Sequence, residues 1–277
     1  MSMNHSCDVS IVATAHRPKN WMRVYNSIIT DLNFEVIFVG PNKAKAELPN
    51  NFKFIRSKVK PTQCVEIALR EARGKYVMIF ADDLVMETPF GLDLLFTRQE
   101  EIDNQFSIAS CRYKYHGQIE PDSKLRFIDG DENSPIVPLS GLMHRSAIEK
   151  IGGIDKRFIA VSYDLDLAMR FHEEGGNVYL NDVFVDELEE LRGASRLFNE
   201  NWIPDRELLN SLWIKNGEFS KNRLDSLNPY VQVGIKKRSQ GPRGHWRGQG
   251  NYLQESLTNL PFLIKRYRIL LAERIKY

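Results

Sequence analysis

The sequence predicts an α/β fold in which a mostly parallel central sheet is flanked by helices, with a C-terminal helical extension. Two observations carry this prediction. Strand-like and helix-like segments alternate over roughly the first 80 residues, which is typical of βαβ units with right-handed crossovers. From about Arg192 the segments become helical and less regular. We therefore expect two domains, an α/β domain in residues 1–192 and a helical, basic extension in residues 193–277.

The first predicted strand runs from Asp8 to Thr14, and the helix after it places Trp21, Met22 and Tyr25 on one face. A later helix begins at Thr62, which we expect to cap it, and Gly74 ends it. The other elements expected in this half are strands at 34–39, 52–56, 76–80 and 106–115 and a helix at 89–102.

The second half of the expected α/β domain begins with a polar excursion over the surface at residues 117–133. Short helix-forming and strand-forming segments follow it. We expect helices at 146–151 and 164–174 and two short strands at 178–180 and 183–185.

The composition is that of an ordinary soluble globular protein, with 42% hydrophobic and 27% charged residues. The net charge is only +2, but residues 231–277 hold ten Lys or Arg against two Glu, which suggests an anionic partner for the tail. Three scattered cysteines indicate free thiols in a reducing compartment. No apolar run approaches the eighteen or so residues of a membrane span, so we expect a cytoplasmic protein without a signal peptide.

The stretch GKYVMIFADDLVME, from Gly74 to Glu87, carries the clearest functional signal. Its apolar run predicts a strand buried on both faces, and Asp82 and Asp83 follow at its carboxyl end, where open α/β sheets bind ligands. Adjacent carboxylates repel each other, which favours a divalent metal that carries a phosphorylated ligand. The alternative is that the two acids only end the strand and cap the next turn.

Five segments resemble family-2 glycosyltransferases of the GT-A fold in their order and spacing, over roughly residues 8 to 190. They are the opening strand with Thr14, ARGKYVMIFADD, SGLMHR, IGGIDKRF and YDLDLAMR. The resemblance implies an enzyme that moves a sugar from a nucleotide-diphosphate donor to an acceptor hydroxyl with inversion. It makes the first domain the nucleotide-sugar-binding and catalytic one.

The resemblance implies Mn²⁺ or Mg²⁺ as the cofactor, because a metal would stabilise the charge that the leaving diphosphate gains. Carboxylates suit both ions. Asp83 matches the metal ligand of the family's D-x-D element and Asp82 its middle position, while Ala81 stands where the first acid would be.

Asp164 matches the family's catalytic base, an acid at the start of a helix that takes the proton of the attacking hydroxyl. Asp166, two residues on, faces elsewhere on the helix and would support the motif. Without the resemblance, Asp164 would be interpreted as a helix N-cap.

The donor site implied by the resemblance includes Thr14, with Arg17 and Asn42 available to contact the nucleotide. Gly141 would allow close backbone approach beneath the donor sugar, and Arg145 could support a phosphate or carboxylate. The alternatives are ordinary strand-end and turn chemistry for Thr14 and Asn42, and a structural ion pair for Arg145.

Two segments of the extension have functional interpretations. The loop SQGPRGHWRGQGN could close over a diphosphate as a lid, with His245 as a further candidate metal ligand, or it could be a plain exposed loop. The segment LPFLIKRYRILLAERIKY predicts a basic amphipathic helix. It could lie on the inner face of an anionic membrane, which suits enzymes that glycosylate lipid-linked acceptors, or pack on protein. The expected acceptor is a carbohydrate or a lipid-linked molecule.

Three rival functions stay open at this point. A nucleotidyltransferase of the same fold would need a glycine-rich phosphate loop after the first strand, and TAHRPKN lacks it. A non-catalytic nucleotide-sugar or carbohydrate binding protein is the second rival, which Ala81 favours. A nucleic-acid binder using the basic tail is the third; we expect no nucleic acid, because Asp83 and Asp164 are both present.

Overall fold

A computed structural model of the chain describes residues 7–42, 47–57, 59–128, 131–138, 140–155, 157–188, 196–215 and 218–219. All of them belong to the first of the two units into which the chain divides, residues 1–235.

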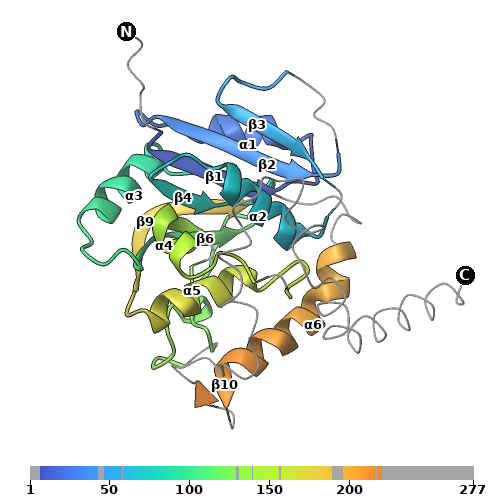
Figure 1. The fold of residues 1–277 in the computed structure, drawn as a ribbon. Coiled ribbons are helices and arrows are strands. Elements are labelled where there is room, and N and C mark those ends of the chain that lie inside the picture. The colour runs from blue at the N-terminus through green and yellow to red at the C-terminus, as the bar shows by residue number, and fades with distance from the viewer. Residues whose placement is uncertain are drawn as a thin grey trace, which may run out of the picture. The chain divides into compact units, whose positions relative to one another are not determined.

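The described residues form a nine-stranded mixed sheet, in which eight strands follow the order β3-β2-β1-β4-β8-β6-β9-β5 and β7 pairs with β6 (Figure 1). The strands of this sheet are β1 Val9–Thr14, β2 Phe34–Gly40, β3 Phe52–Arg56, β4 Tyr76–Ile79, β5 Leu84–Met86, β6 Ile108–Tyr115, β7 Gln118–Ile119, β8 Gly141–His144 and β9 Val178–Glu187. A small antiparallel pair, β10 Ile214–Lys215 and β11 Glu218–Phe219, lies outside it.

The first four strands of the chain are parallel to one another, as the βαβ pattern predicts. β1 pairs with β2 from Val9 opposite Phe34 to Thr14 opposite Val39, and with β4 from Val9 opposite Tyr76. The carboxyl ends of β1, β2 and β4 therefore meet at one edge of the sheet. β8 runs antiparallel to both β4 and β6, whereas β6 and β9 are parallel.

Helices cover both faces of the sheet. They are α1 Trp21–Ser27, α2 Pro61–Glu71, α3 Gly91–Glu100, α4 Arg145–Lys150, α5 Tyr163–Glu173 and α6 Arg196–Trp213, with a 3₁₀ turn at Asp122–Leu125. One apolar core joins α1 and α3 to one face, and the other core joins α2, α4, α5 and α6 to the opposite face. Burial of apolar side chains on both faces explains why β1 and β4 are continuous hydrophobic runs.

Most predicted elements are present, and three expectations need correction. The two short strands expected at 178–180 and 183–185 are one strand, β9, which bulges opposite Cys111. The polar segment 117–133 contains β7 and the 3₁₀ turn. Thr62 does not cap α2, because Lys60 is the N-cap residue and Pro61 begins the helix.

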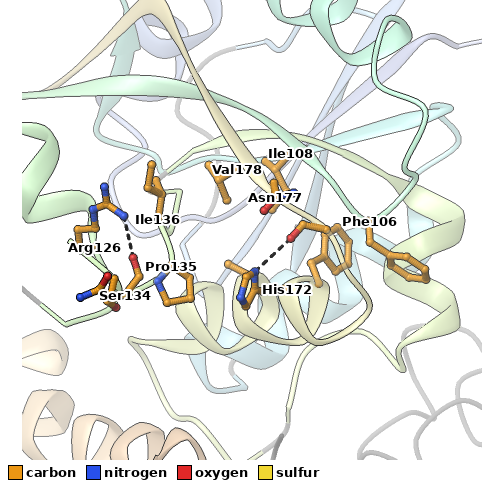
Figure 2. Close-up of a pocket in the computed structure, with 13 residues that line it drawn as sticks. Phe106, Ile108, Arg126, Ser134, Pro135, Ile136, His172, Asn177 and Val178 are labelled. Atoms are coloured by element: carbon orange, nitrogen blue, oxygen red, sulfur yellow. Dashed lines mark hydrogen bonds between the residues drawn. The ribbon is translucent and has the colours of Figure 1, made fainter. Parts of the chain in front are cut away.

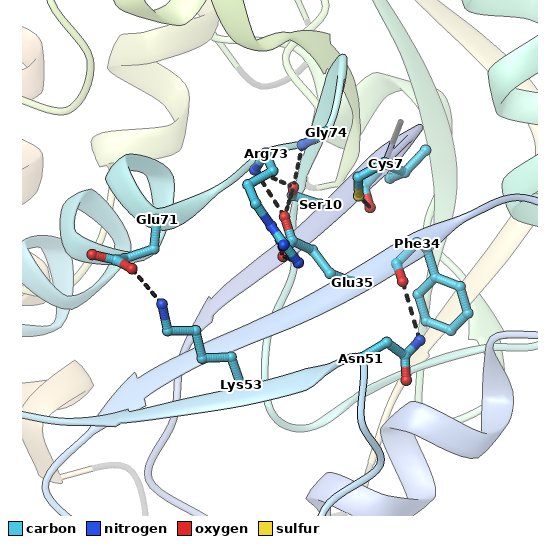
Figure 3. A network of polar contacts seen from close by, with 10 residues as sticks. Cys7, Ser10, Phe34, Glu35, Asn51, Lys53, Glu71, Arg73 and Gly74 are labelled. Carbon is cyan, nitrogen blue, oxygen red and sulfur yellow. Dashed lines mark hydrogen bonds and ion pairs between the residues drawn. The ribbon is translucent and has the colours of Figure 1, made fainter. Parts of the chain in front are cut away.

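A polar network fixes the amino ends of the central strands (Figure 3). Glu35 of β2 accepts hydrogen bonds from Ser10 Oγ and from the Arg73 backbone and guanidinium, each at 2.8 Å. Ser10 Oγ in turn accepts the Gly74 N–H at 2.8 Å. These contacts satisfy a buried carboxylate at the edge opposite to Asp82, so the network positions β4 without entering the candidate site.

Candidate functional site

Asp82 is a buried anchor at the carboxyl end of β4, with 2% of its surface exposed. Its Oδ2 accepts the backbone N–H groups of His16 and Arg17 at 2.5 Å each and the Trp21 indole N–H at 3.3 Å. Its Oδ1 accepts Arg17 Nη1 at 2.6 Å. Asp82 thus ties the loop after β1 to the end of β4.

Asp83 shares the same arginine but lies in a different environment. Its Oδ2 lies 3.1 Å from Arg17 Nη2, and its backbone carbonyl accepts the Leu188 N–H at 2.7 Å. Burial raises the pKa of Asp83 to about 6, with smaller contributions from the charges of Asp82 and Glu187 and an opposing one from Arg17. Arg17 therefore brings one positive charge to two adjacent carboxylates.

Glu187 comes from the end of β9, and its charge contributes to the raised pKa of Asp83. Its carboxylate accepts the Tyr113 hydroxyl, and burial together with this hydrogen bond raises the pKa of Tyr113. The neighbouring Asp186 accepts the Gly117 N–H at 3.1 Å. The pairing of β6 with β9 is the long-range contact that gathers these residues.

At this edge the described side chains offer the predicted metal few free ligand atoms. Among the residues that the structure describes, no group of three or more His, Cys, Asp or Glu side chains is placed to hold a metal ion. Both oxygens of Asp82 are already engaged by N–H donors, which leaves Asp83 as the predicted ligand of the pair. Mg²⁺ sites commonly combine one or two carboxylates with substrate phosphates, so Asp83 alone would depend on phosphate oxygens.

The loops after β1 and β2 pack closely at the same edge. A Cβ at Gly40 would lie 1.8 Å from the Ala15 carbonyl oxygen, so only glycine permits this approach. Asn42 Nδ2 donates to the His16 carbonyl at 2.6 Å. Asn42 therefore supports the loop that holds Asp82, in line with the turn-chemistry alternative.

Thr14 lies at the carboxyl end of β1, next to α2. The Thr14 side chain hydrogen bonds to the thiol of Cys64 on α2, while burial raises the pKa of that thiol to about 11. Cys64 and Tyr163 belong to one core cluster, and Tyr163 precedes Asp164 at the start of α5. Thr14 therefore adjoins the core cluster that contains the first residue of α5.

Asp164 is partly buried in the first turn of α5, and its Oδ1 accepts the adjacent Leu165 N–H at 3.0 Å. Burial raises its pKa to about 6, and backbone hydrogen bonds lower it; no neighbouring charge contributes among the described residues. Asp164 is not the N-cap residue, because Ser162 occupies that position. Asp164 therefore stands at the second position of the helix, where its carboxylate still accepts one first-turn amide.

Ser162 is strained. Its φ of 62° lies in the left-handed region, which non-glycine residues seldom adopt. Its side chain is buried, and its hydroxyl has no hydrogen-bond partner within the described part of the chain. Strain and an unsatisfied hydroxyl beside Asp164 are features that cluster at functional sites.

The other candidates are placed differently. Gly141 starts β8 and is packed within the sheet, where a Cβ would lie 2.8 Å from the Ala109 carbonyl oxygen. Arg145 lies at the amino end of β4, opposite to the acid pair, and donates to the Gly74 carbonyl and to Glu149. These contacts favour the structural ion pair for Arg145.

His245, the loop around it and the basic helix at 260–277 lie outside the described residues, as does the membrane contact expected of that helix. Within the described ranges, the helices are too short or too polar to cross a membrane.

A cavity of about 300 Å³ lies where β6 and β9 begin, at the end of β9 opposite to Glu187 (Figure 2). Arg126, Ser134 and His172 contribute polar groups to its lining, and Ile108 and Val178 contribute apolar ones. None of the predicted site residues lines it. The cavity is therefore separate from the edge that holds Asp82.

The arrangement of strands and helices is that of the GT-A glycosyltransferases, which confirms the predicted fold and the resemblance. Solved structures of S. aureus TarS, a family-2-like member of that class, share this fold. A structure of its residues 1–349 is 13% identical, with a TM-score of 0.50, and the match covers 91% of this chain and 78% of that one.

Two further TarS structures match comparably. The complex of residues 1–349 with UDP is 14% identical with a TM-score of 0.53 and the same coverage, and a longer TarS chain is 13% identical with a TM-score of 0.51. The match covers 91% of this chain but 47% of that longer one. No protein-family model matches this sequence, and no curated protein matches it by sequence.

Proposed function

We propose that this protein is an inverting glycosyltransferase that transfers a sugar from a nucleotide-diphosphate donor to an acceptor hydroxyl. The observation that carries the proposal is Asp164: a carboxyl group with a pKa of about 6 beside the strained Ser162, on a GT-A fold. A base with a pKa near the working pH is efficient at proton transfer. The TarS complex with UDP supports a nucleotide-sugar donor for this fold.

In the proposed reaction, Asp164 accepts the proton of the acceptor hydroxyl while that oxygen forms a bond with the anomeric carbon. The bond between this carbon and the diphosphate oxygen breaks on the opposite side of the sugar, and the configuration inverts. Arg17 is the cation that lies at the acid pair, and it would stabilise charge on the leaving diphosphate. Asp82 holds the loop that carries Arg17.

Mn²⁺ or Mg²⁺ stays an untested prediction. If bound, it would add positive charge near the leaving diphosphate. Thr14 and Asn42 remain proposed donor contacts, because Thr14 ends β1 at this edge and Asn42 donates to the loop that follows it.

A thermal-shift screen of the purified protein against UDP, GDP, CDP, dTDP and their sugars, with and without Mn²⁺, tests the donor site. A ligand that binds only the folded state raises the melting temperature, so one responding nucleotide identifies the base. The same samples are assayed for release of nucleoside diphosphate in the presence of candidate carbohydrate and lipid-linked acceptors. The anomeric configuration of the product, determined by NMR, tests inversion.

Binding of a nucleotide sugar without turnover by any acceptor would favour the non-catalytic binding protein, which shares the fold and which Ala81 keeps open. No response to any nucleotide would contradict the donor site. A response that depends on Mn²⁺ would support the metal prediction, whereas an equal response in EDTA would contradict it.

A further inference from the structure

We propose that Asp205 of α6 is a positioning residue for Asp164, so that the catalytic unit extends beyond the expected boundary at residue 192 and includes α6. The inference rests on the proposed function of Asp164. It concerns a residue for which the sequence offered no functional interpretation.

Asp205 binds the backbone of the loop that leads into α5. It is fully buried, and its carboxylate accepts the consecutive N–H groups of Ile159, Ala160 and Val161 at distances of 2.8–3.1 Å. Three amides directed at one carboxylate form an anion-binding concavity. Hydrogen bonds from amides to a charged carboxylate, such as these, are stronger than hydrogen bonds between neutral groups.

The same loop is held from its other side by α2. Thr62 Oγ1 donates to the Phe158 carbonyl at 2.7 Å, and the Thr62 N–H donates to the Ile159 carbonyl at 3.3 Å. The carbonyl groups of the loop are thus fixed by α2 and its N–H groups by α6. The last amide held by Asp205 is that of Val161, and the strained residue Ser162 lies between it and the helix that carries Asp164.

α6 also fixes α5 directly. The Trp213 indole N–H donates to Asp166 Oδ1 at 3.1 Å, and Asp166 Oδ2 accepts Arg170 Nε at 2.8 Å. Trp213, Leu209 and Leu212 are fully buried in the core cluster that contains Tyr163. The helix that carries Asp164 and the loop before it are therefore both attached to α6.

These contacts determine where the Asp164 carboxylate lies. The left-handed conformation of Ser162 is strained and persists only where its surroundings enforce it. Asp205 holds the residues just before Ser162 and so helps to maintain that conformation. Its removal would free the loop to relax, and displacement of a base by about 1 Å can reduce a rate about a hundredfold.

Hydrogen exchange followed by mass spectrometry tests the placement without any assumption about activity. In Asp205→Ala and Asp205→Asn variants of the full chain, peptides that cover 158–166 should exchange at least tenfold faster than in the parent, while peptides that cover β4 stay unchanged. Ser211→Ala, on the exposed side of α6, is the matched control and should exchange like the parent. Unchanged exchange at 158–166 in both Asp205 variants would overturn the proposal.

Kinetics of the same variants separate positioning from stability. Positioning predicts that kcat per folded molecule falls at least tenfold in Asp205→Ala, with nucleotide affinity within twofold of the parent and with a partial recovery in Asp205→Asn, which keeps one acceptor oxygen. Parental kcat per folded molecule would overturn the proposal. If the parent itself transfers no sugar, the proposed function fails, and faster exchange at 158–166 would still establish Asp205 as the support of this loop.

Discussion

The end of β4 and the start of α5 have the same components in different combinations. Each has an anchoring carboxylate that binds the amides of a loop, Asp82 at the first and Asp205 at the second. Each also has a second carboxyl, Asp83 or Asp164, whose pKa burial raises to about 6. The difference is Arg17, which contacts both acids at β4, whereas the pKa of Asp164 reflects only burial and backbone hydrogen bonds among the described residues.

This difference separates two uses of a buried acid. Arg17 opposes the effect of burial on the pKa of Asp83, and its permanently charged guanidinium suits a fixed electrostatic frame for a diphosphate. A carboxyl group that no neighbouring charge influences can gain and lose a proton near neutral pH, which suits a base. The four predictions below test this contrast, from the largest expected change in free energy to the smallest.

Replacement of Asp82 should produce the largest effect. Asp82→Ala removes the acceptor of two amides, an indole and Arg17, so we expect the free energy of unfolding to fall by about 3–5 kcal/mol. Urea denaturation measures it. Asp182→Ala is the control, since this residue is 90% exposed and pairs with Arg112 on the surface. Equal losses in the two variants would contradict an anchoring role.

Replacement of Asp164 should affect turnover rather than stability. Asp164→Asn removes the proposed base, so kcat should fall a hundredfold or more while nucleotide affinity stays near that of the parent. Steady-state kinetics and calorimetric titration provide the two measurements. The control is Glu174→Gln, an exposed acid just after α5. Undiminished transfer by Asp164→Asn would remove it from the role.

The pH dependence should follow Asp164. Because the base acts when deprotonated and burial raises its pKa to about 6, kcat/KM should fall about tenfold per pH unit below that value. Asp83 titrates in the same range, so the profile of Asp83→Asn distinguishes the two. The acidic limb should persist in this variant. If the acidic limb disappears, the pH dependence comes from Asp83 and not from Asp164, and the proposed difference between the two sites is wrong.

Two indole hydrogen bonds give the smallest expected effects. Trp213→Phe removes the 3.1 Å hydrogen bond to Asp166 and should lower the free energy of unfolding by about 1 kcal/mol. Trp21→Phe removes the longer, 3.3 Å hydrogen bond to Asp82, which keeps three other donors, and should cost about half as much. Urea denaturation of both variants compares the two losses of unfolding free energy. A larger loss in Trp21→Phe would mean that Asp82 depends on its indole donor more than Asp166 does.

The sequence predicted those parts of the molecule that depend on neighbouring residues. Apolar runs identified β1 and β4, because a strand buried on both faces needs them. The position of Asp82 and Asp83 followed from the end of such a run. The start of α5 at Tyr163 could be placed within a residue from its helical pattern.

The rest depends on contacts between distant residues. β8 could not be oriented from its own four residues, and its antiparallel pairing with β4 is what moves Arg145 away from the acid pair. Asn181 interrupts the apolar pattern of β9 because it lies in a bulge, where it donates to Ser110. The role of Asp205 could not be predicted from neighbouring residues, because the amides that donate to it belong to a loop 44 to 46 residues earlier.

The sequence separation between Asp205 and the loop that it binds matters during synthesis of the chain. A ribosome makes the chain from its amino end, so residues 159–161 emerge well before their acidic partner. A nascent chain that ends before α6 already contains Asp83 and Asp164 but lacks the carboxylate that organises the loop between α4 and α5. The loop before α5 therefore gains its proposed support only after strands β1 to β9 have been made.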